Sequence, residues 1–443
     1  MLPILVQNAI TSFISLLDNV MVGRVGTEQM SGVSIVNQLI FVFNLCIFGT
    51  ISGAGLFGAQ FFGKGDHEGV RYTFRFKLYS TFVVFAVFLT VFITLGEPLI
   101  SLYLHEGSET GDLALTLKYA KDYLAVALIG LLPFTITQVY SSTLREVGHT
   151  VPPMMAGICG VAVNLLFNYI LIFGKFGAPA LGVVGAAIAT VLSRFVETAV
   201  IIIWAHTHKQ KCEFVKGVYR SLRVPIPITK AIIKKGFPLL LNETLWASAQ
   251  AMLLQCYSLR GIAVVSAMNI TNTIYNTFSV LFLALGSAIA LMLGHILGTG
   301  DVQKARDSAR KMITFSLGTG IICALFVAAC APVFPYIYNT TDEVRTLATS
   351  FGFVIAMVAP IQAYTNACYY TIRSGGKSLI VFLFDSVYVW CINVLLAFVL
   401  TRFTSLPIFA VYMCVQGIDV LKATLGTIIV VHGSWAVDLT KKL

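Results

Sequence analysis

Two acidic residues stand inside long apolar stretches of the chain, where an ionised side chain is costly. Asp18 lies in "SFISLLDNVMVGRVG" and Glu243 lies in "LLLNETLWASAQ". A carboxylate near the middle of a bilayer costs about 2.5–3.5 kcal/mol on insertion scales, so an acid there indicates a functional site. Neither acid has a basic residue within one turn of its own helix, and we expect both to be unpaired. Such a group can exchange a proton, or bind a hard cation with nearby amide and hydroxyl oxygens.

Other polar side chains lie in the apolar stretches at helical spacing. Asn164 and Asn168 stand one turn apart in "NLLFNYILIFG", and Asp385 lies in a later stretch. Serine and asparagine stripes also hold transmembrane helices together, so the faces of Ser12 and Asn269 fit either a structural or a functional role.

The chain contains two pairs of oppositely charged residues whose members lie on the same helix face and can neutralise each other. Arg194 and Glu197 are three residues apart, and so are Asp419 and Lys422. Mutual neutralisation accounts for both pairs without a function. Arg194 is the only basic residue that we expect in the middle of a span.

Long apolar helices must hold these residues. The chain has 443 residues, of which 57% are hydrophobic and 11% charged, whereas soluble proteins carry about 25% charged residues. Apolar runs of about 20 residues recur along the chain, without the period-2 alternation of a β-barrel. We predict an all-α polytopic membrane protein with twelve transmembrane helices, at 2–22, 32–61, 78–100, 120–144, 152–174, 180–206, 237–259, 264–297, 312–336, 347–372, 378–401 and 405–431. The nine scattered cysteines are expected to be reduced.

The basic residues are unevenly distributed among the loops between these spans. Most lie on one side of the membrane, and the stretch 209–235 alone carries eight of them. The positive-inside rule then puts both termini in the cytoplasm, with the protein in the cell (inner or plasma) membrane. The net charge of +10 therefore reflects the excess of basic residues in the cytoplasmic loops, and no nucleic-acid partner is needed to explain it.

The two halves of the chain share one plan. At a constant offset without gaps, "GKGDHEGVRYTFR" falls on "GTGDVQKARDSAR", which places Gly63 on Gly298 and Arg71 on Arg306. We expect Asp66 and Arg71 in the first turn, and Asp301 and Arg306 in the second, to hold their loops in place by hydrogen bonds or ion pairs rather than to bind substrate. Parallel repeats of six spans are typical of transporters with a substrate site at the repeat interface. The predicted domains are a six-helix lobe 1–206, a cytoplasmic basic linker 207–236 and a second six-helix lobe 237–443, the two lobes being pseudo-symmetric.

Several segments resemble a known transporter family. "LPILVQNAITSFISLLDNVMVGRVG", "FFGKGD", "LREVGHT" and "TIRSGGKS" are similar to segments of the multidrug and toxic compound extrusion (MATE) family, including its DinF-like and NorM-like branches. The similarity covers essentially the whole chain. It implies export of organic, often cationic and amphipathic compounds, driven by inward H⁺ or Na⁺. It also implies that Asp18 couples ions with Asn164 as its partner, and that Glu243 binds a cation.

The sequence departs from the family pattern at two positions. Asn168 stands where the family often has Asp, and Gln362 stands where some members have an acid, for which Asp385 is expected to compensate. We predict ion coupling at Asp18, Asn164, Asn168, Glu243 and Asp385, with Na⁺ binding possible at Glu243 and Asp385. We expect the substrate cleft to be lined by Asn8, Ser15, Asn37, Trp246, Asn272, Gln362 and Asn366.

The predicted function is a secondary antiporter that works by alternating access, as a monomer in the lipid bilayer, on a small organic molecule. It needs no cofactor beyond H⁺ or Na⁺ as the coupling ion. The alternative is a lipid-linked oligosaccharide flippase of the same superfamily. Such a protein should line its cleft with several basic residues, whereas Arg194 is the only basic residue expected in the middle of a span. An intramembrane enzyme is disfavoured because the sequence has no HExxH, GxSxG or phosphate-cradling loop.

Overall fold

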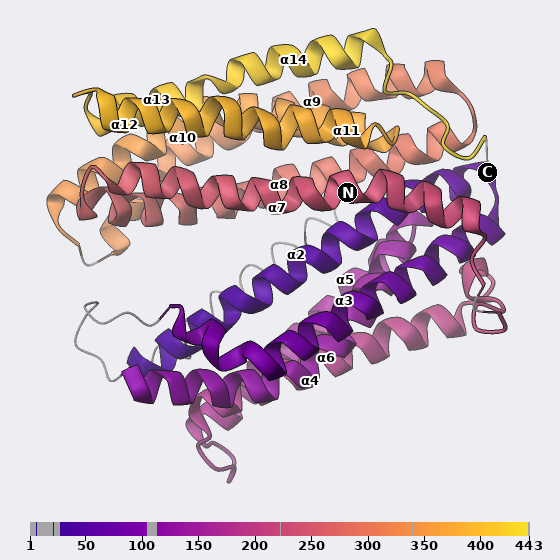
Figure 1. Ribbon diagram of the computed structural model, residues 1–443, viewed down its shortest axis with the longest axis horizontal. Coiled ribbons are helices and arrows are strands. Elements are labelled where there is room, and N and C mark those ends of the chain that lie inside the picture. The colour runs from indigo at the N-terminus through magenta and orange to yellow at the C-terminus, as the bar shows by residue number, and fades with distance from the viewer. Residues whose placement is uncertain are drawn as a thin grey trace. The chain divides into compact units, whose positions relative to one another are not determined.

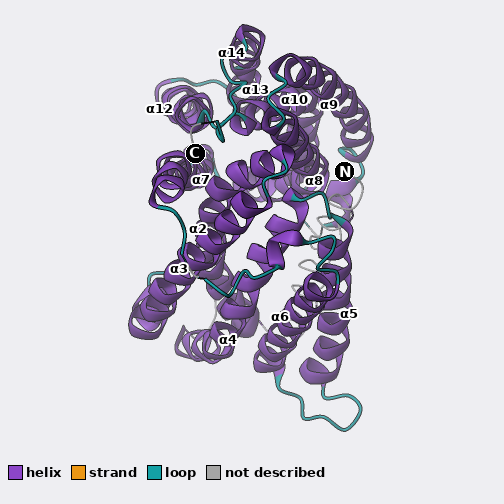
Figure 2. Ribbon diagram, turned by 90° about the vertical axis from the view of Figure 1, so that its right-hand side faces the viewer, coloured by secondary structure: helices purple, strands orange, loops and turns teal. Residues whose placement is uncertain are grey.

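The computed structural model describes residues 6, 21, 27–103, 113–221, 223–338 and 340–441. Within these ranges the chain forms helices joined by loops and no strand (Figure 1, Figure 2). The longer helices are α2 (Thr27–Lys64), α3 (His67–Ser101), α4 (Leu113–Glu146), α5 (Val151–Phe173), α6 (Gly182–Thr207), α7 (Ile226–Ser258), α8 (Ile262–Gly298), α9 (Val302–Cys330) and α10 (Asp342–Ser374). The shorter ones are η1 (Glu213–Val215), η2 (Phe334–Ile337), α11 (Ser378–Phe382), η3 (Leu383–Val387), η4 (Val389–Val394), α12 (Leu395–Phe403), α13 (Ile408–Gly417) and α14 (Asp419–His432).

The chain is an all-α integral membrane protein, as the sequence predicts. Ten helices in the described residues are long and apolar enough to cross a membrane. The predicted span 237–259 coincides with α7 up to Ser258, and α7 is not among these ten helices. The predicted span 2–22 lies outside the described residues, apart from residues 6 and 21.

Three of the predicted elements differ from the structure in a way that matters for the C-terminal unit. Helix α7 begins at Ile226, so residues 226–236 are helical although we placed them in the linker. The predicted span 378–401 contains the π-helical segments η3 and η4 between α11 and α12. The predicted span 405–431 is divided at Ile418 into α13 and α14. Hydrophobic periodicity detects an apolar span but not a local change of helix type, because a π turn adds only one residue to a turn.

The described helices form two compact units. One contains residues 2–58 and 67–229, and we call it the N-terminal unit; the other contains 59–66 and 230–443, and we call it the C-terminal unit. In the N-terminal unit, α6 packs against α4 and α5. In the C-terminal unit, α10 packs against α8, α9, α13 and α14, so α10 forms the centre of that bundle.

The last turns of α2 and α8 cross at two glycines that are equivalent in the sequence repeat. A side chain at Gly63 would collide with the backbone of His295, and a side chain at Gly298 would collide with the backbone of Gln60. The repeat offset that pairs Gly63 with Gly298 also pairs Gln60 with His295. The two contacts are therefore reciprocal.

The turn at 301–306 holds the chain as the sequence predicts. An oxygen of Asp301 accepts a hydrogen bond from the backbone N–H of Lys304 at 2.9 Å, which caps the N-terminus of α9. Arg306 donates to the carbonyl of Gly433 at 3.2 Å and so ties down the segment that follows α14.

A buried ion pair joins α3 to α4 in the N-terminal unit. The ammonium of Lys77 lies 2.6 Å from the carboxylate of Glu146, and the side chains are 0% and 5% exposed. Lys77 also donates to Thr143 at 3.1 Å. The sequence places Lys77 in a cytoplasmic loop, before the predicted span 78–100. That placement is wrong, because α3 begins at His67, eleven residues before the predicted span, and Lys77 forms an ion pair with Glu146 of α4.

We predict that Lys77→Met destabilises the detergent-solubilised protein by about 3–5 kcal/mol, because buried Glu146 loses the cation that is bonded directly to it. Lys77→Met/Glu146→Gln should recover much of this loss. Thermal unfolding followed by circular dichroism measures both variants. The control is Lys121→Met, which breaks the exposed pair between Lys121 and Glu97 and should cost at most about 1 kcal/mol. Equal losses for the buried and the exposed pair would contradict the prediction.

Candidate functional site

Glu243 forms an ion pair with a basic residue of a distant helix. Its Oε1 accepts a hydrogen bond from Arg373 Nη1 of α10 at 3.3 Å and from the hydroxyl of Tyr369 at 3.4 Å. The Glu243 and Arg373 side chains are 17% and 6% exposed. The expectation that Glu243 is unpaired is therefore wrong. Arg373 follows the predicted span 347–372 and reads as a loop residue, but α10 extends to Ser374 and keeps it in the bundle.

A second ion pair lies in the same unit. The ammonium of Lys422 on α14 is 2.7 Å from Oδ1 of Asp385 in η3, and the two side chains are 12% and 14% exposed. Lys422 therefore pairs directly with Asp385 and not with Asp419 as expected, although an electrostatic interaction between Lys422 and Asp419 remains. Asp419 instead accepts a hydrogen bond from Asn393 Nδ2 at 3.0 Å. Sequence spacing finds partners on the same helix but cannot find Asp385, which another helix presents.

Asn242 connects the two ion pairs. Its Nδ2 donates to Asp385 Oδ2 at 3.1 Å and to the hydroxyl of Tyr369 at 3.3 Å. Arg373 Nη1 also donates to that hydroxyl, at 3.0 Å. A continuous polar chain therefore runs from Lys422 through Asp385, Asn242 and Tyr369 to the pair of Glu243 and Arg373. We call these six residues the C-terminal network.

The backbone of η3 is fixed to Asn242 as well. The N–H of Ser386 donates to Asn242 Oδ1 at 3.3 Å, and its hydroxyl donates to the same oxygen at 2.8 Å. Asp385 lies in this π-helical segment, and π-helical turns are often found at functional sites. The position of the carboxylate is determined by these bonds and not only by packing.

Aromatic rings support both cations of the network. The guanidinium of Arg373 lies 5.7 Å from the ring centre of Tyr369 and 5.6 Å from that of Tyr370. The ammonium of Lys422 lies 5.4 Å from the ring centre of Phe384. Ring faces attract cations, so each basic group has a second source of stabilisation if its carboxylate is neutralised.

None of the predicted cleft residues of the C-terminal unit is a member of the network. Asn366 and Tyr370 pack against Gly286 of α8, where a Cβ would collide with both side chains. Gln362 donates to Gln416 Oε1 at 3.4 Å. Trp246 and Asn272 lie at exposed positions of α7 and α8.

The predicted residues of the N-terminal unit are described only in part. Asn168 donates to Asn164 Oδ1 at 3.0 Å, and Asn164 donates to Thr190 of α6 at 3.3 Å. Asn37 accepts a hydrogen bond from the hydroxyl of Tyr123 at 3.4 Å. The remaining predicted residues, Asp18, Asn8 and Ser15, lie outside the described residues.

Arg194 and Glu197 form the predicted pair at 3.1 Å, but Arg194 is not the only basic residue inside a span. Arg373 and Lys422 lie in α10 and α14 and are largely buried. A flippase is disfavoured only if the spans lack further basic residues. Because Arg373 and Lys422 are such residues, that reason against a flippase does not hold.

The described part of the chain contains no group of three or more His, Cys, Asp and Glu side chains that could hold a metal ion. Glu243 and Asp385 each have a basic partner within hydrogen-bond distance. A Na⁺ ion at either carboxylate would have to share it with a guanidinium or an ammonium group, and Na⁺ binding there stays a prediction.

Comparison with known proteins finds a family and a fold. A family model described as MatE matches residues 3–170 and 238–399. "Probable multidrug resistance protein NorM" of Thermotoga maritima is 24% identical, over 98% of this chain and 91% of its own. "Multidrug resistance protein MdtK" of Pectobacterium atrosepticum is also 24% identical, over 81% of this chain and 75% of its own.

Two solved structures share the fold. A MOP superfamily transporter from Pyrococcus furiosus, described as having a binding pocket of reverse polarity that suggests a different function, is 18% identical. It covers 97% of this chain and 93% of its own, with a TM-score of 0.87. A mutant of the Vibrio cholerae MATE transporter VcmN is 16% identical, covers 99% and 96%, and has a TM-score of 0.86.

A double-mutant cycle tests which acid holds Lys422. We predict a coupling free energy of about 2 kcal/mol between Asp385→Asn and Lys422→Gln, because the two charges are in direct contact away from bulk water. Asp419→Asn with Lys422→Gln is the matched control and should give about 0.5 kcal/mol or less, the usual value for a pair on one helix. Chemical unfolding in detergent measures both cycles. A larger coupling for Asp419 would show that the pairing is the one read from sequence spacing.

Proposed function

The chain belongs to the MatE family, and on this premise we propose that it is a secondary antiporter that exports organic cations in exchange for protons. The family match covers most of the chain in two segments, 3–170 and 238–399. Relatives named as multidrug resistance proteins support export of organic compounds, and they support a transporter rather than an enzyme. The cationic character of the substrate and the use of protons are our proposals.

The C-terminal network is the observation that carries the proposal. Ionised Glu243 attracts a cation, and in the network that cation is Arg373. A cationic substrate competes with Arg373 for the same carboxylate. Protonation of Glu243 removes the negative charge, and the substrate then loses its electrostatic partner. Protons and substrate therefore exclude each other, which is the requirement for antiport.

Coupling needs a second element, because a ligand shifts a conformational equilibrium only by its differential affinity for the two states. Asn242 and Tyr369 supply a connection from Glu243 to Asp385 and Lys422, and so from α7 and α10 to η3 and α14. Neutralising Glu243 changes the hydrogen bonds along this chain. We propose that the helices repack between inward-open and outward-open states in response, and the effects of proton and substrate on each other are then reciprocal.

Protons fit the network better than Na⁺. A hard cation prefers several converging oxygen ligands, which carboxylate, carbonyl and water oxygens supply. Both network carboxylates already accept hydrogen bonds from a basic group and from neutral donors. A proton neutralises a carboxylate without requiring further ligands. Asp18 stays a predicted second proton site, next to Asn164 and Asn168 by resemblance to the family.

We propose the following setting for this activity. The protein works as a monomer in the inner or plasma membrane, with both termini in the cytoplasm because the basic loops lie on that side. Its partners are the small organic substrate and the bilayer, and it uses no cofactor beyond the coupling ion.

A second candidate function is transport of an anionic amphiphile, such as a lipid carrying a phosphate-linked sugar. Buried Arg373 and Lys422 favour it, since basic groups within a bundle can bind a phosphate. Against it, each of these cations is matched by a carboxylate, so the network has no excess positive charge. The Pyrococcus furiosus neighbour described with a pocket of reverse polarity illustrates that this fold accommodates both signs.

Proteoliposomes loaded with the organic cation ethidium test the proposal. We expect Glu243→Gln/Arg373→Gln to reduce efflux driven by a pH gradient about tenfold or more, within the range of coupling free energies between sites. Removing both partners avoids leaving Arg373 buried and unpaired, so the variant should still fold. Asp18→Asn, measured alongside, should also reduce pH-driven efflux.

The matched control is Glu97→Gln/Lys121→Gln, which removes an exposed ion pair and should leave efflux unchanged. Full pH-driven efflux in the Glu243→Gln/Arg373→Gln variant would contradict the coupling role of the network. Efflux that follows an imposed Na⁺ gradient and ignores the pH gradient would contradict proton coupling. Translocation of a phosphate-linked lipid without ethidium efflux would favour the second candidate.

A further inference from the structure

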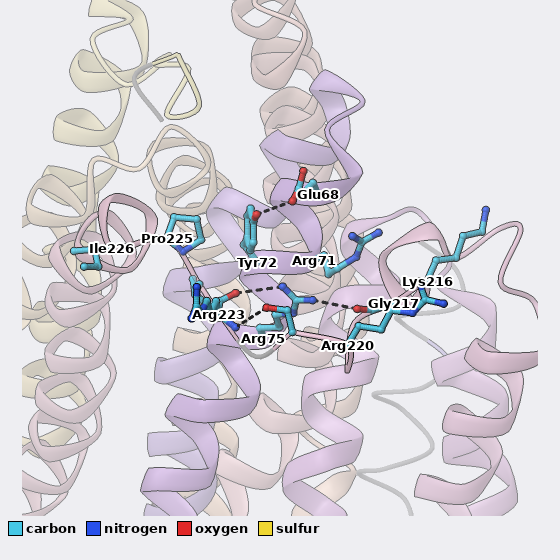
Figure 3. A pocket seen from close by; sticks show the side chains of 12 residues that line it. Glu68, Arg71, Tyr72, Arg75, Lys216, Gly217, Arg220, Arg223, Pro225 and Ile226 are labelled. Carbon is cyan, nitrogen blue, oxygen red and sulfur yellow. Dashed lines mark hydrogen bonds between the residues drawn. The ribbon is translucent and has the colours of Figure 1, made fainter.

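The N-terminal unit contains a basic cavity that the transport proposal does not use. The cavity has a volume of about 870 Å³ and lies between the first turns of α3 and the connector that follows α6 (Figure 3). Its lining includes Arg71, Arg75, Lys216, Arg220 and Arg223, against a single acidic residue, Glu68. The lining therefore carries a strong excess of positive charge.

Of the basic residues that line the cavity, only Lys216 has an acidic ion-pair partner among the described residues. Glu68 accepts a hydrogen bond from the hydroxyl of Tyr72 at 2.6 Å. Glu213 lies 3.3 Å from Lys216 and 3.3 Å from His67. Among the described residues, no carboxylate forms an ion pair with Arg71, Arg220 or Arg223, as the ion pairs of the unit show. The guanidinium groups of these three arginines are therefore available to bind an anionic ligand.

Arg75 gives the cavity a fixed wall. It is buried, and it donates to the carbonyls of Val218 at 2.9 Å, Gly217 at 3.1 Å and Arg223 at 3.2 Å. These bonds hold the connector against α3 while leaving the positive charge of Arg75 without a carboxylate. The connector is therefore an ordered rim, and the exposed side chains of Arg220 and Arg223 project from it.

Arg71 supplies a donor that is not satisfied within the described structure. Its Nε atom is buried and has no hydrogen-bond partner there. A buried donor without a partner costs about 1–3 kcal/mol, so it favours a ligand with acceptor oxygens. Arg71 also lies in the first turns of α3, where the helix dipole adds positive potential.

The cavity has an apolar end. Pro225 and Ile226 line it on the side away from Lys216 (Figure 3). Ile226, at the start of α7, is 68% exposed. An arginine-rich site beside exposed apolar side chains suits an anion that is attached to an apolar group, because guanidinium groups bind phosphate oxygens in a bidentate manner.

We propose that this cavity binds a phosphate group, carried either by the headgroup of an anionic lipid or by a soluble phosphate ester. The four arginines contact the phosphate oxygens, and Pro225 and Ile226 contact the attached apolar group. The site lies in the stretch that joins the two halves of the sequence, and it is distinct from the C-terminal network.

Binding to the full-length protein in neutral detergent micelles tests the proposal. The probes are fluorescent phosphatidylglycerol, fluorescent phosphatidylcholine, inorganic phosphate and ATP. We expect phosphatidylglycerol to bind more tightly than phosphatidylcholine. Arg220→Gln/Arg223→Gln should weaken phosphatidylglycerol binding about tenfold, from the usual contribution of each basic residue near an anionic surface. Both side chains are exposed, so the variant should fold normally.

The control is Lys209→Gln/Lys211→Gln, which removes two exposed charges of the same connector outside this cavity and should change the affinity less than twofold. Competition by ATP or inorganic phosphate that is lost in the Arg220→Gln/Arg223→Gln variant identifies a soluble phosphate ligand. Binding of phosphatidylglycerol without such competition identifies a lipid headgroup. Equal losses in the two double variants, or equal binding of the two lipids with no binding of ATP or phosphate, would overturn the proposal.

Discussion

A charge that is enclosed by apolar helices must be compensated, and this constraint shapes both units of the protein. Lys77 is compensated by Glu146, Glu243 by Arg373, and Asp385 by Lys422. Each pair joins two helices, and in the C-terminal unit the partners come from distant parts of the sequence. Removing one partner of such a pair is far more costly than replacing both. The pairs therefore fix which helices lie side by side, and they also limit which charges can change.

The same constraint accounts for the proposed transport chemistry. A carboxylate held by a built-in cation can exchange that cation for a substrate or a proton, and the rings of Tyr369 and Tyr370 then stabilise the guanidinium of Arg373. The Glu243–Arg373 contact, at 3.3 Å, is longer than the Lys422–Asp385 contact, at 2.7 Å, and it is shared with Tyr369. We infer that Glu243 is the member of the network that exchanges partners, while the pair of Asp385 and Lys422 anchors it through Asn242.

The sequence predicts the helices better than it predicts the site. Long apolar runs identify the spans, and the repeat predicts the equivalence of Gly63 and Gly298, which the structure brings into reciprocal contact at the α2–α8 crossing. The local pair of Arg194 and Glu197 is also predicted, because its partners are three residues apart. Spacing along the sequence instead places Arg373 in a loop and pairs Lys422 with Asp419. Their true partners depend on helix packing, and spacing along one helix contains no information about it.

The central claim is that protons and organic cations compete for Glu243. Proton release on substrate binding tests it most directly, with purified protein and ethidium in a weakly buffered solution containing a pH indicator. At a pH low enough for part of the Glu243 population to be protonated, the wild-type protein should release protons as ethidium binds, and its affinity should rise with pH, because the two ligands are reciprocally linked. Glu243→Gln/Arg373→Gln should release fewer protons. The same proton release from both proteins, or none from the wild type, would contradict the claim.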